Sequence, residues 1–594
     1  MLDSPVRRRR RQFDPAPHER ELVAIVNEIV HAPGLDRRQL DGALKRFPKD
    51  GCGLFSRSEL IAGFRYFKTE HWHALDEADF VAKLRLRPVR TQSGVTPVTV
   101  LTRPFPCPGE CIFCPNDVRM PKSYLADEPG AQRAEDNHFD PYLQTWNRLD
   151  AYRSIGHPVE KVELIVLGGT WSFHPEAYQV WFVKRCFDAL NDYGSGLDGR
   201  ARAGHAPAPW RDVAPIGRGA AGTYNQRISA LLHESECASW EALFASHRIN
   251  ETALCRSVGL AVETRPDHIS AEEVVRIRRL GGTKVQIGLQ SLSDDVLDRN
   301  RRGCDVAASR RALRMLRGAG FKLHAHWMPN LLGSSPKQDA EDFSRLFDDP
   351  DFRPDELKLY PCSLIESAEL MNHYETGEWR PYDREELVDL LATCLERTPA
   401  YCRVTRVIRD FSAGDIVAGN KVANLREVAE AALAARGAAS REIRAREIRD
   451  AYFDPSLLTL SVETYQTSVG VEHFLEFTTP GDRLVGFLRL SLPRAPIASA
   501  ELRHSAMIRE VHVYGDSLGV GRRGEGKAQH LGLGRRLIER AERISAEAGF
   551  RDLAVISAVG TRDYYRQLGF VDGELYQHLA QGGDSAVSEL EGVS

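Results

Sequence analysis

Three cysteines lie within eight residues in the run Cys107-Pro-Gly-Glu-Cys111-Ile-Phe-Cys114-Pro115. Iron–sulfur clusters are held by cysteine thiolates, ordinarily four of them, and structural zinc is likewise closed by four protein ligands. A compact loop with only three thiols can hold three corners of a [4Fe–4S] cube and leave one iron open to a small molecule. The spacing therefore predicts a catalytic cluster on Cys107, Cys111 and Cys114. A zinc site completed by a distant His or Cys is the alternative.

Length and composition are those of a globular chain with several domains. At 594 residues the chain is too long for one core and should hold about two to four domains. Its apolar content of 42% and charged content of 27% are ordinary. We expect no membrane span and no secretory signal, because no stretch is long and apolar enough and the N-terminus is basic. The eleven cysteines are otherwise scattered, which favours reduced thiols and a cytoplasmic location.

The first 90 residues carry an excess of positive charge. They contain 18 Lys and Arg against 13 Asp and Glu, although the whole chain has a formal net charge of −4. Five consecutive arginines, Arg7–Arg11, are typical of a solvated tail and also of a phosphate-binding arm. Helical spacing follows over Glu19–Val30, Arg37–Phe47 and Arg57–Phe67. The aromatic residues Phe64, Tyr66, Phe67 and Trp72 alternate with cations, a pattern that suits stacked bases but is equally typical of a helical core.

From about residue 91, short apolar runs alternate with helical patterns. This alternation predicts an α/β domain with a parallel sheet and right-handed crossovers, here a partial (β/α)6 barrel. The loops after the strands would carry the chemistry, and the cysteine loop follows the first strand. The expected strands are Val98–Thr102, Val162–Leu167, Gly259–Glu263, Lys284–Leu289, Lys322–Trp327 and Glu356–Tyr360, and the expected helices include Pro175–Leu190, Ala271–Leu280, Val306–Arg317 and Asp339–Phe347.

The aromatic Phe113 completes the pattern Cys-x3-Cys-x-aromatic-Cys, which resembles that of radical S-adenosylmethionine enzymes. In those enzymes the amino and carboxylate groups of S-adenosylmethionine chelate the open iron. Polar and glycine residues at the strand ends could orient this ligand through paired hydrogen bonds or close backbone approach, although each also suits a turn or a barrel-capping bond. These candidate S-adenosylmethionine residues are Gly168, Gly169, Glu263, Arg265 and Gln290.

The C-terminal third shows a second fold. Val511–Tyr514 reads as a strand, and a glycine-rich turn leads into the amphipathic helix Arg536–Ala548. Unpaired backbone N–H groups at such a helix start favour a pyrophosphate. The turn resembles the acyl-CoA loop of GNAT acetyltransferases, with Gln529, Gly532, Leu533, Gly534 and Arg535. Leu553–Ser557 would be the next strand, and a tyrosine in Tyr564–Phe570 could protonate the departing CoA thiolate or simply pack.

A radical S-adenosylmethionine barrel followed by an acetyltransferase domain resembles the catalytic subunit of Elongator and its stand-alone bacterial and archaeal relatives. The resemblance covers about residues 83 to 575 and several specific stretches. These stretches are Arg87–Gly94, Asp140–Tyr142, Lys161–Thr170, Val262–Asp267, Leu357–Pro361, Asn424–Arg426, Arg509–Gly515 and Gly560–Arg566.

The resemblance implies a tRNA carboxymethyluridine synthase that uses acetyl-CoA and S-adenosylmethionine to modify carbon 5 of the wobble uridine (position 34) in the anticodon stem-loop of tRNA. A deoxyadenosyl radical would take a hydrogen atom from the acetyl methyl group, and the resulting carbon radical would add to the uridine. Family positions implied to contact acetyl-CoA are Lys161, Glu510, Val511, His512, Val513, Gln529, Gly532, Leu533, Gly534, Arg535 and Tyr565, of which Lys161 and Tyr565 are the expected catalytic residues. The alternative function is a protein lysine acetyltransferase with a structural cluster.

The expected domains follow from these patterns. They are a basic arm and helical tRNA-binding module at 1–82, a radical domain at 83–395, a linker at 396–455, an acetyltransferase domain at 456–580 and a flexible tail at 581–594. Residues 194–250, rich in Gly, Ala, Pro and Arg at their start, are expected to be a surface insertion. Many relatives have a zinc-binding, cysteine-rich stretch before the acetyltransferase domain, but Ser440–Arg446 contains no cysteine. We therefore expect no structural zinc, no obligate protein partner, and a monomer or homodimer.

Overall fold

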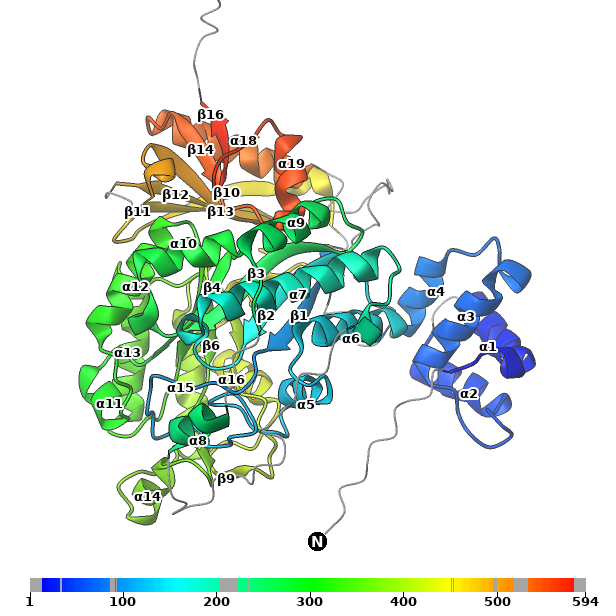
Figure 1. The fold of residues 1–594 in the computed structure, drawn as a ribbon, viewed down its shortest axis with the longest axis horizontal. Helices are drawn as coiled ribbons and strands as arrows, with labels where there is room; N and C mark the ends of the chain where they lie inside the picture. The colour runs from blue at the N-terminus through cyan, green and yellow to red at the C-terminus, as the bar shows by residue number, and fades with distance from the viewer. Residues whose placement is uncertain are drawn as a thin grey trace, which may run out of the picture. The chain divides into compact units, whose positions relative to one another are not determined.

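Two units divide the chain in the computed structural model (Figure 1). The smaller unit is Met1–Thr91 with Asn147–Val159, and the larger is Gln92–Trp146 with Glu160–Ser594. The structure describes residues 13–32, 35–85, 91, 93–202, 223–231, 236–449, 451, 453–494, 499–515 and 532–581. The arginine arm, Arg87, Arg90, Gln529, parts of the expected insertion (203–222 and 232–235) and residues 582–594 lie outside this description.

The smaller unit is helical, as the spacing predicts. Its helices are α1 (Glu19–His31), α2 (Arg37–Arg46), α3 (Arg57–His71) and α4 (Glu77–Leu84), together with the second half of α6 (Pro141–Ser154). Helices α2 and α3 both begin with a capping box, Asp36 with Gln39 and Ser56 with Glu59, in which two free N–H groups are satisfied reciprocally. The sequence itself therefore sets where these helices start.

The aromatic residues of α3 form the core of this unit. Phe64, Phe67 and Trp72 are at most 5% exposed, whereas Tyr66 is 59% exposed. The Lys83 ammonium donates to three carbonyls at the end of α1, at 3.0 to 3.1 Å, and the Arg85 guanidinium donates to a carbonyl of the same unit. Lys83 and Arg85 therefore stabilise the unit, and a tRNA-binding role for the basic stretch at residues 83–90 stays a prediction.

A sheet of seven parallel strands forms the centre of the larger unit. Its order is β1-β2-β3-β4-β5-β6-β8, and each neighbouring pair is parallel. The α/β class and the partial barrel are confirmed. The strands are β1 (Val95–Leu101), β2 (Lys161–Leu167), β3 (Arg256–Thr264), β4 (Lys284–Gln290), β5 (Lys322–Trp327), β6 (Glu356–Leu359) and β8 (Arg403–Arg406).

Helices surround this sheet, and several of the expected ones are present within one to four residues of their predicted ends (Figure 1). Helix α12 contacts β4 and β5, and α7 contacts β3, so these helices cover the outer face of the sheet. The helices of the unit before the second sheet are α5 (Pro129–Asp136), the first half of α6, α7 (Glu176–Gly194), α8 (Tyr224–Leu231), α9 (Trp240–Asn250), α10 (Ala271–Arg279), α11 (Asp294–Arg299), α12 (Val306–Gly318), α13 (Pro336–Asp348), α14 (Leu370–Glu375), α15 (Arg384–Arg397), α16 (Leu425–Ala435) and α17 (Ile443–Arg446), with a small ladder of β7 (Leu364–Ile365) and β9 (Ile416–Ala418).

The seventh strand, β8, corrects the expected linker at 396–455. Its four residues contain one buried apolar side chain, Val404, between the polar residues Arg403 and Thr405, so the segment is too short and too polar to show strand periodicity. The expected absence of zinc stays a prediction, and buried ion pairs contact this segment. Fully buried Glu442 accepts hydrogen bonds from the Val404 N–H and pairs with Arg426, while Arg446 lies 2.7 Å from Glu476.

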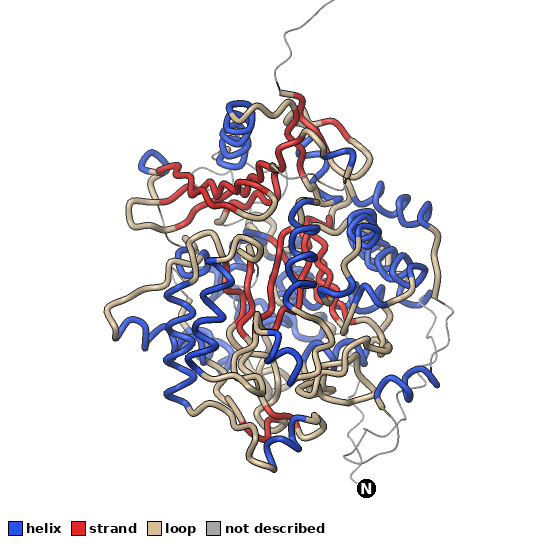
Figure 2. Tube along the Cα trace, turned by 90° about the vertical axis from the view of Figure 1, so that its left-hand side faces the viewer, coloured by secondary structure: helices blue, strands red, loops and turns tan. Residues whose placement is uncertain are grey.

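The second sheet follows the order β10-β11-β12-β13-β14-β16-β15 and packs against one long helix. Figure 2 shows the strands gathered in two main sheets within the larger unit. The elements are β10 (Thr459–Gln466), β11 (Gly470–Thr478), β12 (Leu484–Pro493), β13 (Ser505–Val513), α18 (Leu533–Glu547), β14 (Asp552–Val555), α19 (Arg562–Arg566), β15 (Val571–Asp572) and β16 (Gln577–Ala580).

Strand β13 diverges from its parallel neighbour β14 part-way along. The two strands pair only over Ser505–Ile508, and the Ile508 carbonyl accepts the last bond, from Ile556, at 3.2 Å. Opposite β12 the register shifts beside Arg509, which is the extra residue of a bulge. Residues 510–513 therefore continue past the end of this ladder, where backbone groups can meet a ligand.

Buried ion pairs join the two sheets of the larger unit. Arg509 on β13 pairs with Asp355, which precedes β6, and lies 2.9 Å from Glu472. Arg489 on β12 lies 3.5 Å from Asp355. All four side chains are at most 1% exposed. Burial alone raises the pKa of Asp355, but the charges of Arg509 and Arg489 outweigh it and lower the pKa to about 2.

The last strand supplies a pH-dependent contact. His578 on β16 lies 2.7 Å from Asp552 and 3.1 Å from Glu501, and hydrogen bonds to these two carboxylates raise its pKa to about 9. Its stabilising effect is therefore complete below the ordinary histidine pKa near 6.5 and is lost as the pH rises through about 9. We expect His578→Gln to lower the unfolding temperature of this domain more at pH 6 than at pH 9.5, measured by calorimetry. An equal loss at both values would contradict the assignment.

Candidate active site

The cysteine loop lies between β1 and α5 and is fixed at both ends. Asn225 on α8 accepts a hydrogen bond from the Cys107 N–H at 2.9 Å and donates to the Cys107 carbonyl at 2.7 Å. Ile112 donates to the Asn300 carbonyl and accepts from the Leu370 N–H. The expected surface insertion thus contributes a helix that clamps the first cysteine. Sequence reasoning missed Asn225, because an asparagine near a helix start looks like an ordinary cap.

The three thiols face cationic and polar groups. The Cys114 thiol contacts that of Cys111, and this contact, with the charge of Arg302, lowers the pKa of Cys111 well below its usual value. Arg302 Nη1 lies 3.7 Å from Cys111 Sγ, and the Thr170 hydroxyl lies 3.7 Å from Cys107 Sγ. Three thiols on one loop, one of them favoured as a thiolate, fit a [4Fe–4S] cluster.

Arg265 extends from the end of β3 to the cysteine loop. It forms a two-pronged ion pair with Asp267 at 2.8 and 2.9 Å and donates to the Arg302 carbonyl. Its third nitrogen, Nη1, is buried without a hydrogen-bond partner among the described residues. A Cβ atom on Gly109 would lie 2.0 Å from this nitrogen, so glycine is required for the approach. An orphaned guanidinium donor beside the cysteines fits an anionic ligand group.

One other expected S-adenosylmethionine residue, Gln290, lies near Arg302. Gln290 ends β4 with φ +70°, and its Oε1 is buried without a partner among the described residues. Gly288 lies between the side chains of Gln290 and Arg302. Arg302 Nη2 donates a hydrogen bond to the Gly288 carbonyl at 2.7 Å. Sequence reasoning missed Arg302, because it follows α11 rather than a strand.

The remaining strand-end residues have partners within the chain. Gly168 has φ +130°, and a Cβ there would lie 2.1 Å from the Thr102 hydroxyl, so its missing side chain serves the contact between β1 and β2. Gly169 has more space around it, because a Cβ atom there would lie no closer than 3.8 Å to any neighbouring atom, the nearest being the Lys122 carbonyl oxygen. Glu263 accepts a hydrogen bond from Tyr124 at 3.3 Å and lies 3.5 Å from His326. The role of these three residues toward a ligand stays a prediction.

The interior of the barrel is polar, whereas barrels of this kind are usually filled by branched apolar side chains. Lys358 donates to Gln286 at 2.6 Å, and His326 lies 3.3 Å from the same oxygen. Burial lowers the pKa of Lys358 to about 8 and that of His326 well below its usual value. Towards the starts of the strands, Lys284 and Lys322 both pair with Glu356. Polar contacts therefore occur along much of the barrel interior between its two ends.

The acetyltransferase strand β13 contacts the barrel end opposite the cysteines. The Glu510 carboxylate pairs with Lys322, the first residue of β5, and accepts from Arg489 at 2.9 Å. Burial raises the pKa of Glu510, but Lys322 and Arg489 outweigh it and lower the pKa below its ordinary value. Glu510 is therefore a fixed anion of the interface.

Helix α18 begins at Leu533, three residues before the expected start at Arg536, so the last three residues of the expected turn are helical. Gly532 has φ +67° and precedes the first turn, which holds Leu533, Gly534 and Arg535. Tyr565 is only 7% exposed and packs on Phe570, whereas a Cβ on Gly534 would lie 3.1 Å from the Tyr564 hydroxyl. The neighbouring tyrosine thus faces the helix start, and the catalytic role of Tyr565 stays a prediction.

Lys161 is the first residue of β2, and its Cα partners in the sheet are Val95 and Arg256. Burial and the charge of Arg256 lower the Lys161 pKa. Gly560, in the turn before α19, packs on Arg256, where a Cβ atom would lie 2.6 Å from that side chain. The turn of the second sheet therefore meets the barrel beside the strand that begins with Lys161.

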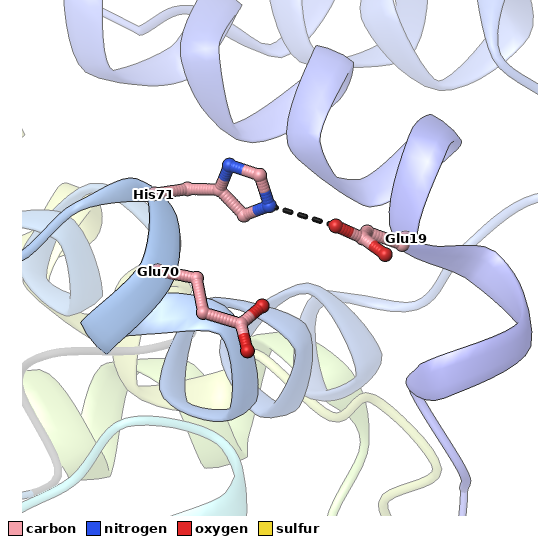
Figure 3. A group of neighbouring side chains, drawn as sticks. All are labelled: Glu19, Glu70 and His71. Atoms are coloured by element: carbon pink, nitrogen blue, oxygen red, sulfur yellow. Dashed lines mark hydrogen bonds and ion pairs between the residues drawn. The ribbon is translucent and has the colours of Figure 1, made fainter.

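A separate group of possible ligands lies in the smaller unit. Glu19, Glu70 and His71 bring one ligand atom each within 4.8 Å of the others, and all three are exposed (Figure 3). His71 lies 2.8 Å from Glu19, an ion pair between α1 and α3. The solvated pair accounts for this geometry by itself.

Comparison with known proteins places the chain among relatives. Residues 239–346 match the Radical SAM superfamily and residues 354–435 the Radical_SAM C-terminal domain. A tRNA uridine(34) acetyltransferase of Methanocaldococcus infernus is 35% identical over 92% of this chain and 96% of its own length. The chain belongs to the Elongator protein 3 family. Elongator complex protein 3 of Danio rerio is 35% identical over 82% of this chain and 84% of its own length.

The structure agrees with this membership. The solved Elp3 of Methanocaldococcus infernus, lacking its first 46 residues, has 32% sequence identity and a TM-score of 0.66, covering 82% of this chain and all of that one. The radical S-adenosylmethionine domain of the Elongator protein 3 family implies S-adenosylmethionine and a [4Fe–4S] cluster, which the thiols and the orphaned Arg265 donor fit. Among the described residues, no helix has the length and apolar character needed to cross a membrane.

Proposed function

We propose that this chain is a tRNA carboxymethyluridine synthase, which adds an acetyl-derived carboxymethyl group to carbon 5 of the wobble uridine. The observation that carries the proposal is the contact between the two catalytic folds. Strand β13, with the expected acetyl-CoA residues 510–513, is joined to the starts of the barrel strands through Glu510 and Lys322. A reaction that uses both an acyl-CoA and a radical needs this kind of fixed connection.

The radical half of the proposal assigns roles to the residues around the cysteine loop. Cys107, Cys111 and Cys114 would hold the cluster, and Asn225 fixes the loop in place. The orphaned donor of Arg265 and the orphaned acceptor of Gln290 would bind the carboxylate and amino groups of S-adenosylmethionine. When bound, the cluster and S-adenosylmethionine supply a deoxyadenosyl radical able to take a hydrogen atom from an acetyl methyl group.

The acyl half of the proposal uses the open end of β13. Backbone groups of residues 510–513 lie past the end of the β13–β14 ladder and would pair with the pantetheine chain. The start of α18, with the backbone N–H groups of its first turn and Arg535, would bind the pyrophosphate. Lys161, which is half-buried at the start of β2, would approach the acetyl end.

The partner of the enzyme would be tRNA. The relatives named tRNA uridine(34) acetyltransferase support an anticodon substrate. The uridine must leave its stack to reach a site inside a barrel, which costs a few kcal/mol, about the cost of unstacking one base. The basic arm and the smaller unit are the proposed tRNA-binding parts, with Arg7–Arg11 as the main source of positive charge.

The contacts of Glu510 disfavour the alternative, a protein lysine acetyltransferase. That reaction needs a carboxylate with a raised pKa to accept a proton from the substrate amine, beside an accessible peptide groove. Glu510 instead has a lowered pKa and is paired with Lys322 and Arg489. Its side chain is 10% exposed and points into the interface with the barrel.

The proposed function is tested by anaerobic reconstitution of the full chain with iron and sulfide. The enzyme is incubated with acetyl-CoA, S-adenosylmethionine and unmodified tRNA, and digested nucleosides are read by mass spectrometry. We expect carboxymethyluridine at position 34, and its formation should require both cosubstrates. Deoxyadenosine formation without any modified nucleoside would refute the tRNA substrate. Acetylated lysine on added peptides under the same conditions would favour the alternative.

A further inference from the structure

Two polar residues from opposite ends of the chain meet beside the open half of β13. The Ser93 hydroxyl lies 3.1 Å from His512 Nε2, and 419 positions separate the two residues in the sequence. Ser93 lies just before the first barrel strand, and His512 lies beyond Ile508, where the ladder between β13 and β14 ends. The pair therefore joins the barrel to the part of β13 that is proposed to contact acetyl-CoA.

The backbone at Ser93 is strained. Its φ is +67°, in the left-handed region, and Gly94 follows with φ +70°. A non-glycine residue held in such a conformation costs on the order of 1–3 kcal/mol and persists only where its surroundings fix it, commonly at functional sites. Ser93 is only 3% exposed, so its hydroxyl is held inside the protein. The surroundings that hold this backbone conformation therefore also hold the Ser93 hydroxyl beside His512.

The imidazole of His512 is held on its faces as well. It stacks on Phe487, with ring centroids 5.8 Å apart and an angle of 15°, and its centroid lies 4.4 Å from that of Tyr514. Burial lowers the pKa of His512 to about 4, so the ring is neutral at neutral pH. A neutral imidazole has one N–H donor and one acceptor nitrogen, and the partner of one nitrogen decides which of the two carries the proton.

We propose that His512 donates a hydrogen bond to the thioester carbonyl of acetyl-CoA, and that Ser93 is the positioning residue that fixes its tautomer. In this arrangement the Ser93 hydroxyl would donate to Nε2, the proton would be on Nδ1, and Nδ1 would donate to the thioester carbonyl. A neutral imidazole polarises a carbonyl without transferring a proton to it. This inference rests on the proposed acetyl-CoA site and adds a catalytic contact to it.

The role follows from what the reaction needs at the acetyl group. Loss of a hydrogen atom from the methyl carbon leaves a radical that is delocalised onto the carbonyl oxygen. A fixed hydrogen-bond donor at that oxygen orients the methyl group and stabilises the electron density that the radical places on the oxygen. The two barrel cations whose charges act on His512 have other partners: Lys322 is paired with Glu356 and Glu510, and Arg403 is paired with Glu447.

Isotope-edited infrared spectroscopy tests the contact directly. Acetyl-CoA labelled with carbon-13 at the carbonyl is bound to the full, reconstituted chain, without tRNA. We expect the carbonyl band to move to higher frequency in His512→Phe and Ser93→Ala than in the unsubstituted enzyme. Ser93→Thr keeps the hydroxyl and should keep the band. A band that is unchanged in His512→Phe would overturn the proposal, and one that moves only in His512→Phe would overturn the role of Ser93.

A matched control is present in the same sheet. Thr464 and His473 form a hydroxyl–imidazole pair at 2.8 Å between β10 and β11, away from β13. Thr464→Ala should leave the carbonyl band unchanged. In the modification assay, His512→Phe should lower the maximal rate about a hundredfold, the usual effect of losing one such donor, with a much smaller change in acetyl-CoA affinity. Because the infrared measurement needs no tRNA, its failure is distinguishable from failure of the proposed function.

Discussion

Replacing Cys111 with alanine should reduce deoxyadenosine and carboxymethyluridine formation at least about a thousandfold, because no group in the chain itself can replace a cluster as the radical source. The loop offers three thiols for three irons, and Cys111 is the buried one beside Arg302. Loss of one thiolate leaves a second iron without a protein ligand. Iron and sulfide content, the visible absorption of the cluster and both products are measured on the anaerobically purified variant.

Cys304 provides the matched control for this substitution. It is a free, partly exposed cysteine two residues after Arg302, outside the three-thiol loop, and its thiol lies 3.7 Å from the Asp305 carbonyl. Cys304→Ala should therefore keep the iron content and both products. A Cys111→Ala variant that retained iron and deoxyadenosine would refute the three-thiol site. Loss of acetyl-CoA binding in that variant would indicate misfolding instead.

Replacing Asp355 with alanine should destabilise the larger unit by about 3–5 kcal/mol, the usual cost of removing one partner from a buried ion pair. The substitution leaves Arg509 and Arg489 buried without their shared carboxylate. It also removes the acceptor of the Leu323 N–H. Because these contacts join the two sheets, we expect the acetyltransferase domain to unfold separately from the barrel. Urea unfolding followed by hydrogen exchange in each domain measures both effects.

An exposed ion pair provides the control for the buried one. Arg535 and Glu539 lie 3.1 Å apart on α18, with side chains 68% and 51% exposed. Glu539→Gln should change the unfolding free energy by less than about 0.5 kcal/mol, as exposed helix pairs generally do. If Asp355→Ala changed the unfolding free energy as little as this control, the buried network would contribute little to joining the domains.

Periodicity predicted the regular elements well where apolar runs were long. All six expected barrel strands are present, and β5 has the predicted bounds, Lys322–Trp327. Strand β8 was missed, because Arg403–Arg406 has a single buried apolar residue and depends on pairing with β6 to be a strand. Helix α4 is not among the expected helices, because its eight residues are too few to show a clear helical period.

The candidate site was predicted in part. The cysteine loop, Arg265 and Gln290 could be named because a short motif and the strand ends of a parallel sheet carry a recognisable pattern. Asn225 and Arg302 could not, since both act from helices or loops whose sequence shows no such pattern. Tyr564 rather than Tyr565 faces the start of α18, a choice that depends on the helix rotation at that point.

The sequence by itself determined the two folds and the family and predicted the three thiol ligands, because each depends on local spacing or on short motifs. Only the tertiary structure decided how the two folds meet. Glu510 is an ion-paired anion because Lys322, 188 residues earlier, lies beside it. Ser93 contacts His512 for the same reason. Such contacts depend on how the sheets pack against each other, and the burial that follows, not the residue type, sets the pKa and the chemistry of these side chains.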